Sequence, residues 1–411
     1  MATPLLPRLI APLVQEALSD TPVVCILGPR QAGKTTLAQK YCGNYSYITF
    51  DDSILLETAR QDPVGFIQGL PEHVILDEVQ RVPELMPAIK TSVDKNRKPG
   101  RFLLTGSANL LLLPKVQESL AGRVEILKLY PLSELEKHRG EHSILKTFLK
   151  NELSTRILGE QSIIEGTAEA VCQGGYPEPN TRTPERARKW HRQYLNAIIQ
   201  RDIKDIAAIR DEDEMSRLME ILAYRTGSLL NISSLATELR IGRDTTEKYL
   251  GILERLFLIR RLPAWHRNRA KRLVKAPKVH VIDSGLAATL TSLKPEDWSN
   301  HSTDFGPLLE SFVVQQLICQ ATWHNSEINF SHYRDKDQVE VDLVIEKNRE
   351  VWGVEVKKTA SIRAKDGAGL SRLAAQAGKR FRGGMILYCG NNTLPLKQPN
   401  CFAVPMNALW Q

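Results

Sequence analysis

The first 135 residues alternate between short apolar runs and longer amphipathic segments. The apolar runs are VVCIL (23–27), YITF (47–50), VILD (74–77), RFLLTG (101–106) and VEILKL (124–129). Such runs, separated by helix-like segments, are typical of parallel strands joined by crossover helices. The pattern therefore predicts an α/β domain over residues 1–135.

The rest of the chain shows three further patterns. Residues 136–215 lack strand-like runs and carry charged amphipathic segments, which predict a helical connector. Residues 216–275 predict a compact helical module with a helix-turn-helix between Ile232 and Arg260, followed by a small wing. In its second helix, Thr245, Thr246 and Lys248 are expected on the exposed face that a DNA major groove would meet. Strand-like alternation returns over residues 276–411 and predicts a second α/β domain.

Charge is concentrated next to the helical module. The segment from Arg255 to Lys278 holds nine Lys or Arg and no acidic residue, enough to account for the net charge of +8. Such a segment suits contact with the phosphate backbone of DNA. The alternative is a protein-interaction module beside a solvated basic linker.

Composition limits the classes of protein that need to be considered. The 411 residues are 42% hydrophobic and 25% charged, as in ordinary globular proteins, and this argues against a disordered chain. No apolar run approaches the length of a membrane helix, and the amino terminus lacks the pattern of a secretory signal. The six cysteines are scattered without a CxxC pair, so we expect reduced thiols and a cytoplasmic protein.

A phosphate-binding loop follows the first apolar run. The sequence GPRQAGKT matches the pattern GxxxxGK[ST], with a strand before it and a helix after it. Backbone amides of such a loop surround phosphate oxygens, Lys34 would reach the β- and γ-phosphates, and Thr35 would bind Mg²⁺. We expect ATP to contact Gly28, Pro29, Arg30, Gln31, Ala32, Gly33, Lys34, Thr35 and Thr36.

Acidic and polar residues follow the later strands of the same domain. Asp77 would hold the Mg²⁺ shell, and Glu78 would orient and polarise the attacking water. At the end of the next strand, Thr105 or Ser107 would contact water or the γ-phosphate, or would only cap the strand. Arg123 would supply positive charge to the transition state, in the same chain or a neighbouring subunit, or would be a surface arginine paired with a carboxylate.

A second group of charged residues lies in the C-terminal domain. Strand alternation over 339–345 and 351–357 would place Glu355 and Lys357 on one face, with Asp342 beside them on a neighbouring strand. Glu310, at the first turn of an upstream helix, would add a carboxylate. Two or three carboxylates and a lysine are what a Mg²⁺-dependent phosphodiesterase needs, with Asp342, Glu355 and Glu310 as metal ligands. The alternative is an antiparallel sheet with a solvated acidic face.

With these residues in view, the chain resembles the prokaryotic AAA-type ATPases that carry a C-terminal domain of unknown function. The resemblance is carried, in this order, by GPRQAGKTTL, VILDEVQRVPEL, FLLTGSANLLLL, SLAGRVEILKLYPLSELE, GGYPEP, QRDI, PKVHVIDSGLA, GPLLESFV, EVDLVIE and GVEVKKT. It implies a RecA-like core related to archaeal ATPases, a winged helix, and a fold similar to PD-(D/E)XK nucleases. It also favours the nuclease-like interpretation of Asp342, Glu355 and Lys357, although such folds can lose catalysis and keep their shape.

The expected fold is an α/β multidomain chain. It comprises a RecA/AAA-like P-loop core (1–135), a helical connector (136–215), a winged helix-turn-helix (216–275) and a nuclease-like α/β domain (276–411). We expect a Mg²⁺-dependent ATPase that couples its nucleotide state to DNA binding, with DNA cleavage left open. The alternative is an ATP-operated switch that binds a protein partner, with the nuclease-like fold as an inactive scaffold. The residues leave open whether the chain forms a homo-oligomer.

Overall fold

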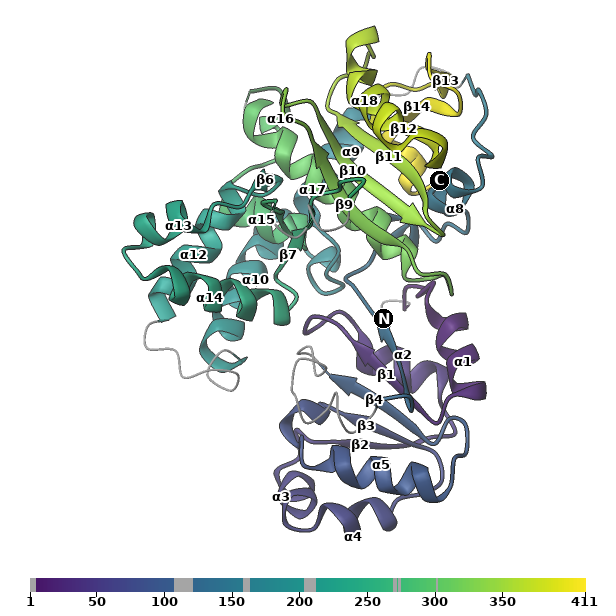
Figure 1. The fold of residues 1–411 in the computed structure, drawn as a ribbon. Coiled ribbons are helices and arrows are strands. Elements are labelled where there is room, and N and C mark those ends of the chain that lie inside the picture. Colours follow the sequence, from purple (N-terminus) through teal and green to yellow (C-terminus); the bar gives the residue numbers. More distant parts are fainter. Residues whose placement is uncertain are drawn as a thin grey trace. The chain divides into compact units, whose positions relative to one another are not determined.

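A computed structural model describes residues 5–106, 121–157, 163–202, 212–268, 272, 275–300 and 302–411. The chain divides into two compact units (Figure 1). The first unit is Met1–Leu132 with Arg255–Phe257, and the second is Ser133–Glu254 with Leu258–Gln411.

The first unit is built on a five-stranded parallel sheet with the order β2-β3-β4-β1-β5. Its strands are β1 (Val23–Leu27), β2 (Ser46–Thr49), β3 (Val74–Asp77), β4 (Phe102–Gly106) and β5 (Val124–Lys128). Its described α-helices are α1 (Ala11–Asp20), α2 (Lys34–Tyr41), α3 (Ser53–Gln61), α4 (Pro63–Gln68) and α5 (Leu85–Lys95). Strands β1, β3 and β4 are buried along their whole length, as expected where helices cover both faces of a sheet. The predicted α/β core is confirmed.

The strand order brings the P-loop close to the end of β3. Strand β4 lies between β1, which leads into the P-loop, and β3, which ends at Asp77. Because all five strands are parallel, the carboxyl ends of β1, β3 and β4 meet at one edge of the sheet.

The second unit begins with helices. They are α7 (Glu134–Lys137), α8 (Ile144–Leu149), α9 (Ile164–Gln173) and α10 (Pro184–Ala197), followed by the short helix η4 (Ile198–Asp202). The only strand-like pairing that the described residues of this segment make is an isolated bridge between Arg156 and Thr393.

Next comes a module of three helices and a three-stranded antiparallel sheet with the order β6-β8-β7. Its elements are α12 (Glu212–Tyr224), β6 (Ser228–Leu229), α13 (Ile232–Leu239), α14 (Arg243–Arg255), β7 (Ile259–Leu262) and β8 (Lys278–Val281). Strand β8 completes this sheet beyond the boundary expected at residue 275. Thr246 was expected on the exposed face of α14 but is fully buried, because helical spacing places it on the same face as the buried Tyr249, Leu250 and Leu253.

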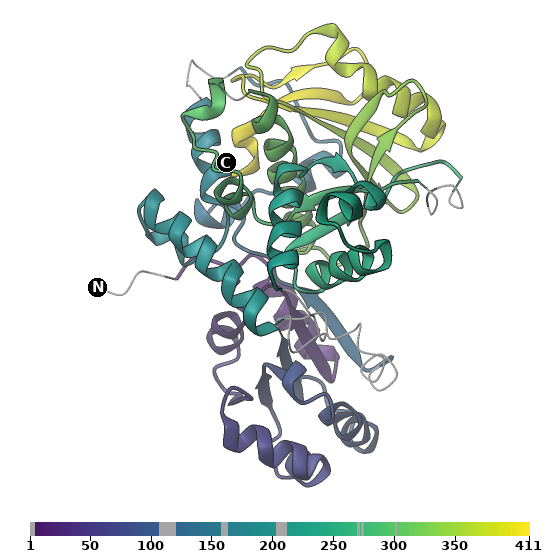
Figure 2. The same ribbon diagram turned by 90° about the vertical axis from the view of Figure 1, so that its left-hand side faces the viewer.

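The remaining residues form a six-stranded mixed sheet with the order β13-β14-β12-β11-β10-β9 (Figure 2). Its strands are β9 (Asn329–Arg334), β10 (Glu340–Lys347), β11 (Glu350–Lys357), β12 (Phe381–Tyr388), β13 (Leu394–Pro395) and β14 (Cys401–Pro405). Its helices are α15 (Ser284–Leu290), α16 (Asp297–Asn300), α17 (Ser302–Ala321) and α18 (Ala368–Ala377). Leu370 and Leu373 of α18 pack on the strands in one buried cluster with Val344 and Val351.

Candidate functional site

The P-loop spans residues 28–35 between β1 and α2. Gln31 and Gly33 both have positive φ, 58° and 95°, so the loop makes two left-handed turns before α2 begins at Lys34. At the start of the loop, a Cβ on Gly28 would lie 1.9 Å from the Leu129 carbonyl oxygen. Only glycine fits so close to another backbone segment.

Lys34 is buried at the base of this loop. Its ammonium donates hydrogen bonds to the carbonyls of Gly28 (3.0 Å) and Pro29 (2.8 Å). These bonds hold the charged group within the loop, at the position from which it would meet phosphate oxygens.

Asp77 is the centre of a hydroxyl cluster at the end of β3. One of its carboxylate oxygens accepts hydrogen bonds from Thr35 (2.8 Å) and from Tyr47 (2.7 Å). The other oxygen accepts from the Thr105 hydroxyl on β4. The two segments that were expected to form the nucleotide site, the P-loop and the Asp77–Glu78 pair, therefore meet at one edge of the sheet.

Glu78 has a left-handed backbone (φ 58°, ψ 39°), which is uncommon outside glycine and is characteristic of functional sites. This turn directs the chain away from β3 directly after Asp77. The side-chain amide of Gln80 donates a hydrogen bond to the Glu78 carboxylate.

The residues present fit ATP and Mg²⁺. A hydroxyl and a carboxylate in contact, Thr35 and Asp77, form an oxygen donor set of the type that Mg²⁺ binds together with phosphate oxygens and water. Backbone amides at the amino end of α2, with Lys34 beside them, suit a triphosphate.

Arg123, another predicted residue, does not join this cluster. Arg123 immediately precedes β5, whose first residue pairs with Val23, so it lies at the opposite edge of the sheet from the P-loop. There it pairs with Asp94, with its Nε 2.5 Å from the carboxylate. Ser107 lies outside the described residues, and Thr105 makes the contact with Asp77.

Sequence reasoning missed two residues at the nucleotide site. Tyr47 reaches Asp77 from β2, and burial together with this hydrogen bond raises the pKa of its phenol. Arg8 donates hydrogen bonds to the Ala32 and Tyr130 carbonyls, both at 2.6 Å, and so ties the P-loop to the segment after β5. An aromatic residue in a short strand and an arginine before the first helix carry no motif that would have identified them.

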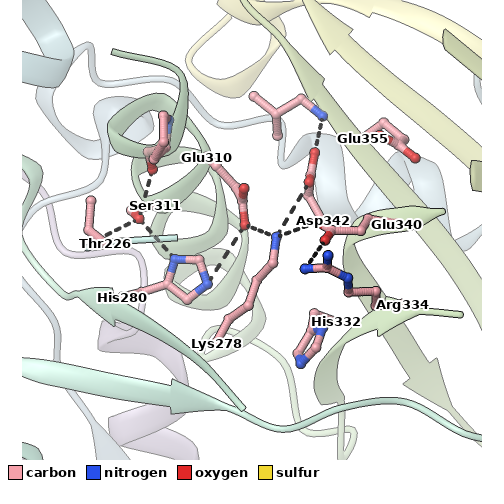
Figure 3. A network of polar contacts seen from close by, with 12 residues as sticks. Thr226, Lys278, His280, Glu310, Ser311, His332, Arg334, Glu340, Asp342 and Glu355 are labelled. Carbon is pink, nitrogen blue, oxygen red and sulfur yellow. Dashed lines mark hydrogen bonds and ion pairs between the residues drawn. The ribbon is translucent and has the colours of Figure 1, made fainter. Parts of the chain in front are cut away.

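A second cluster of charged side chains lies in the second unit (Figure 3). We call Glu310, Glu340, Asp342 and Glu355 the carboxylate centre. The Lys278 ammonium lies among three of them, 2.8 Å from Glu310, 3.5 Å from Glu340 and 3.7 Å from Asp342. Lys278 and Glu340 were not among the predicted site residues, although a lysine within the apolar strand KVHV was a usable signal.

The predicted residues of this centre lie close to one another. Glu355 accepts a hydrogen bond from Lys357 at 3.0 Å, as alternation on β11 predicts. Asp342 accepts one from the Val356 amide at 2.8 Å. The pairing of β9 with β10 shifts register between Val341 and Val344, an irregularity of the kind that redirects a side chain, and simple alternation did not foresee it.

Burial and repulsion between the carboxylates shift the pKa values of the side chains in this centre. Burial raises the pKa of Glu310 to about 8, and the Asp342 carboxylate adds to the rise. The same two causes raise the pKa of Glu355 to about 8. Burial alone would lower the pKa of Lys278, but Glu310 and Asp342 outweigh it and raise this pKa, so the ammonium is charged at neutral pH.

His280 lies two residues further along β8 and borders the same centre. Burial lowers its pKa well below the ordinary value, so the imidazole is neutral and its 3.9 Å approach to Glu310 is not an ion pair. Its Nδ1 is 2.9 Å from the Ser311 hydroxyl.

The carboxylate centre does not fit a divalent metal as it is built. Among the described residues, no three His, Cys, Asp or Glu side chains are arranged to hold a metal ion. The position between Glu310 and Asp342 is taken by the Lys278 ammonium (Figure 3). The expected metal ligation by Glu310, Asp342 and Glu355 is therefore not supported by the geometry.

The basic segment from Arg255 to Lys278 is not one free positive surface. Arg261 pairs with Glu247 and Glu254, Arg272 pairs with Glu346, and Lys278 is buried in the carboxylate centre. Arg255, Arg267 and Lys275 are exposed, whereas Arg269 and Lys271 lie outside the described residues. Part of the local charge is thus neutralised by carboxylates outside the segment, some nearby in sequence and some, such as Glu346, distant.

The parallel sheet, the P-loop and the acidic pair define an α/β core of the P-loop nucleotide-binding class. Consistently, residues 20–137 match the family model described as an AAA domain. Residues 164–297 match a domain of unknown function (DUF8612), and residues 305–409 match another (DUF4143). The expected C-terminal domain of unknown function is therefore present.

Two curated relatives match most of the chain. They are the uncharacterized proteins Mb2031c of Mycobacterium bovis and Rv2008c of Mycobacterium tuberculosis. Each is 29% identical over 350 residues, which is 85% of this chain and 73% of the relative.

Solved structures match at lower identity. The Walker-type ATPase of Pyrococcus abyssi is 16% identical, with 68% of this chain and 94% of that chain covered and a TM-score of 0.42. RuvB of Thermotoga maritima is 16% identical, with coverages of 62% and 89% and a TM-score of 0.30. DnaA of Aquifex aeolicus, bound to AMPPCP, is 18% identical, with coverages of 59% and 86% and a TM-score of 0.27.

A search of the described helices for a membrane span found none that combines sufficient length with sufficient apolar character.

Proposed function

We propose that the protein is a Mg²⁺-dependent ATPase whose active site is the P-loop edge of the first unit. The observation that carries this proposal is the 2.8 Å hydrogen bond between Thr35 and Asp77, which joins the P-loop to the acidic pair. These two residues are far apart in the chain, and a chance motif would have no reason to bring them into contact.

Each residue then has a defined task in hydrolysis. Backbone amides of the loop, other than that of Pro29, and the Lys34 ammonium would bind the phosphates. Thr35 and Asp77 would hold Mg²⁺, which would supply positive charge to the phosphate oxygens. Glu78 orients the water and accepts its proton as the water oxygen bonds to the γ-phosphorus. The bond from this phosphorus to the β–γ bridging oxygen breaks, and ADP and phosphate leave.

Two substitutions test this assignment. Lys34→Ala should abolish ATP binding, whereas Lys40→Ala, an exposed lysine of the same helix, should leave it unchanged. Glu78→Gln should retain ATP binding and lose on the order of 100-fold or more in turnover, because only the proton acceptor is removed. Normal affinity and turnover in Lys34→Ala would reject the site.

As a second function we propose that the helical module contacts DNA. Its order, α12-β6-α13-α14-β7-β8 with the sheet order β6-β8-β7, supports a winged helix, and α14 carries the exposed side chains Arg243, Lys248 and Arg255. Lys248 and Arg255, two turns apart, lie on one side of the helix, and Arg243 lies at its amino end; exposed cations in these positions suit phosphates beside a major groove. The competing proposal is a protein partner on the same face.

Salt dependence separates these two proposals. DNA affinity should fall steeply with salt, and the double variant Arg243→Gln/Lys248→Gln should lower the slope of log affinity against log salt by about 2, one for each lost phosphate contact. The control is Lys397→Gln, an exposed cation outside both the helical module and the basic segment. Absence of salt-dependent DNA binding would favour the protein partner.

For the remaining part we propose a nuclease-like fold without metal-dependent cleavage. The element order α17-β9-β10-β11-α18-β12, with Asp342 and the Glu355–Lys357 pair on adjacent strands, supports the fold. The position of Lys278 argues against the cleavage chemistry, because its ammonium lies between Glu310 and Asp342, two of the three expected metal ligands.

A further inference from the structure

Lys278 and the carboxylate centre come from different parts of the second unit. Lys278 belongs to β8 and lies within the match at 164–297, whereas the carboxylates lie on α17, β10 and β11, within the match at 305–409. Figure 3 shows the lysine side chain extending from β8 into the space between Glu310 and Asp342. A segment that is foreign to the nuclease-like fold thus supplies a cation to its centre.

The lysine is held firmly in this position. Its side chain is only 3% exposed, and its backbone pairs with Leu229 on one side and Leu262 on the other. The strand pairing fixes the backbone of Lys278, and burial together with the ion pair to Glu310 holds its side chain in the centre. Because the ammonium is tethered, its local concentration at the centre far exceeds that of a free cation.

The carboxylates are also engaged. Glu310 contacts Lys278 at 2.8 Å, and Glu340 pairs with Arg334 at 2.7 Å. Asp342 and Glu355 accept hydrogen bonds from the Val356 amide and from Lys357. Buried carboxylates need such partners, and here all four have them without a metal.

We propose that Lys278 is the resident cation of the carboxylate centre and excludes divalent metal from it. The ammonium takes the place of Mg²⁺ or Mn²⁺ between Glu310 and Asp342, so the wild-type protein has no divalent-cation site there. Removal of this single charge converts the centre into a metal site.

The physical basis is competition for the same oxygens. Mg²⁺ requires oxygen ligands at about 2.0–2.1 Å in octahedral geometry, and those oxygens already contact the ammonium. A divalent ion placed beside it would also meet direct like-charge repulsion in a poorly solvated site. Methionine has a length close to that of lysine and carries no charge, so Lys278→Met removes the cation and retains much of the packing.

Mn²⁺ alone, added to nucleotide-free protein, provides the test, with bound Mn²⁺ counted by electron paramagnetic resonance. Wild type and Asp342→Asn should bind the same number of ions. Lys278→Met should gain one site at least 100-fold tighter than any binding that wild type shows at this centre, and Lys278→Met/Asp342→Asn should lose it. Mn²⁺ should also raise the thermal midpoint of Lys278→Met more than that of the double variant.

Two results would overturn the proposal. One is a Mn²⁺ site in wild type that Asp342→Asn removes, and the other is a folded Lys278→Met that gains no site. If Lys278→Met fails to fold, the Mn²⁺ counts of wild type and Asp342→Asn still test the proposal, because both proteins retain Lys278. The inference does not rest on the proposed ATPase, whose residues belong to the other unit, so Lys34→Ala should leave all Mn²⁺ counts at this centre unchanged.

Discussion

Replacement of Gly28 by alanine tests how tightly the P-loop is fixed. A Cβ at this position would lie 1.9 Å from the carbonyl oxygen of Leu129 and 3.0 Å from its carbonyl carbon. Ordinary contact begins at 3.4 Å, so the two backbone segments must separate by about 1.5 Å. Both neighbours are backbone atoms, and therefore no side-chain rotation can relieve the overlap.

This displacement is large for a phosphate-binding loop. Overpacking of this kind costs about 1–3 kcal/mol of stability, and a misplacement of about 1 Å costs on the order of 100-fold in rate. We therefore expect Gly28→Ala to lose about two orders of magnitude in ATP turnover, measured by steady-state phosphate release. Thermal or urea unfolding of the first unit should show a loss of about 2 kcal/mol.

Gly43→Ala is the matched control. Gly43 follows α2 in the same unit, its φ is not positive, and an added Cβ would meet nothing within 4 Å. This variant should keep wild-type turnover and stability. If Gly28→Ala behaves like Gly43→Ala in both assays, the close approach of the loop to Leu129 does not position the site.

Three further predictions each concern one side chain. Tyr47→Phe removes one of the hydroxyls on Asp77 and should weaken Mg²⁺-dependent ATP binding several-fold; an unchanged Mg²⁺ titration would show that the phenol does not hold the carboxylate. Arg123→Ala should leave both turnover and stability of the isolated chain almost unchanged, because its partner Asp94 is exposed and solvent screens the pair. A large loss of turnover that depends on protein concentration would instead support a role across a subunit boundary. Burial lowers the pKa of His332 to about 4, so between about pH 6.5 and 4 the unfolded chain binds a proton that the folded chain excludes. Stability should therefore fall by about 3 kcal/mol as the pH drops through this range, and His332→Asn should flatten this slope in pH-dependent unfolding; an equally steep slope in the variant would refute the assignment.

Much of the first unit could be predicted from local sequence. The P-loop needs glycine at Gly28 and Gly33, a lysine and a threonine within eight residues, and a strand and a helix on either side of it. Asp77 and Glu78 end a buried strand, and parallel strands place their carboxyl ends at one edge. These features are local in sequence, or follow from strand direction alone, and so they could be recognised before the structure was known.

The carboxylate centre shows where such reasoning stops. Asp342, Glu355 and Lys357 were predicted from alternation along two strands, but the irregular register of β10 beside Asp342 leaves no local signature. Lys278 was counted as part of a basic surface, since charge counting along the chain cannot reveal which carboxylates a lysine will meet.

The sequence by itself determined the P-loop, the acidic pair that follows it and the alternation of strands and helices, because each is written in residues that are neighbours or follow a fixed period. Only the tertiary structure decided that Arg123 lies at the end of the sheet opposite the P-loop and that Lys278 fills an acidic centre. Those outcomes depend on strand order and on contacts between segments tens of residues apart. A buried charge is unfavourable unless it is paired, and only the fold determines which partner lies next to it.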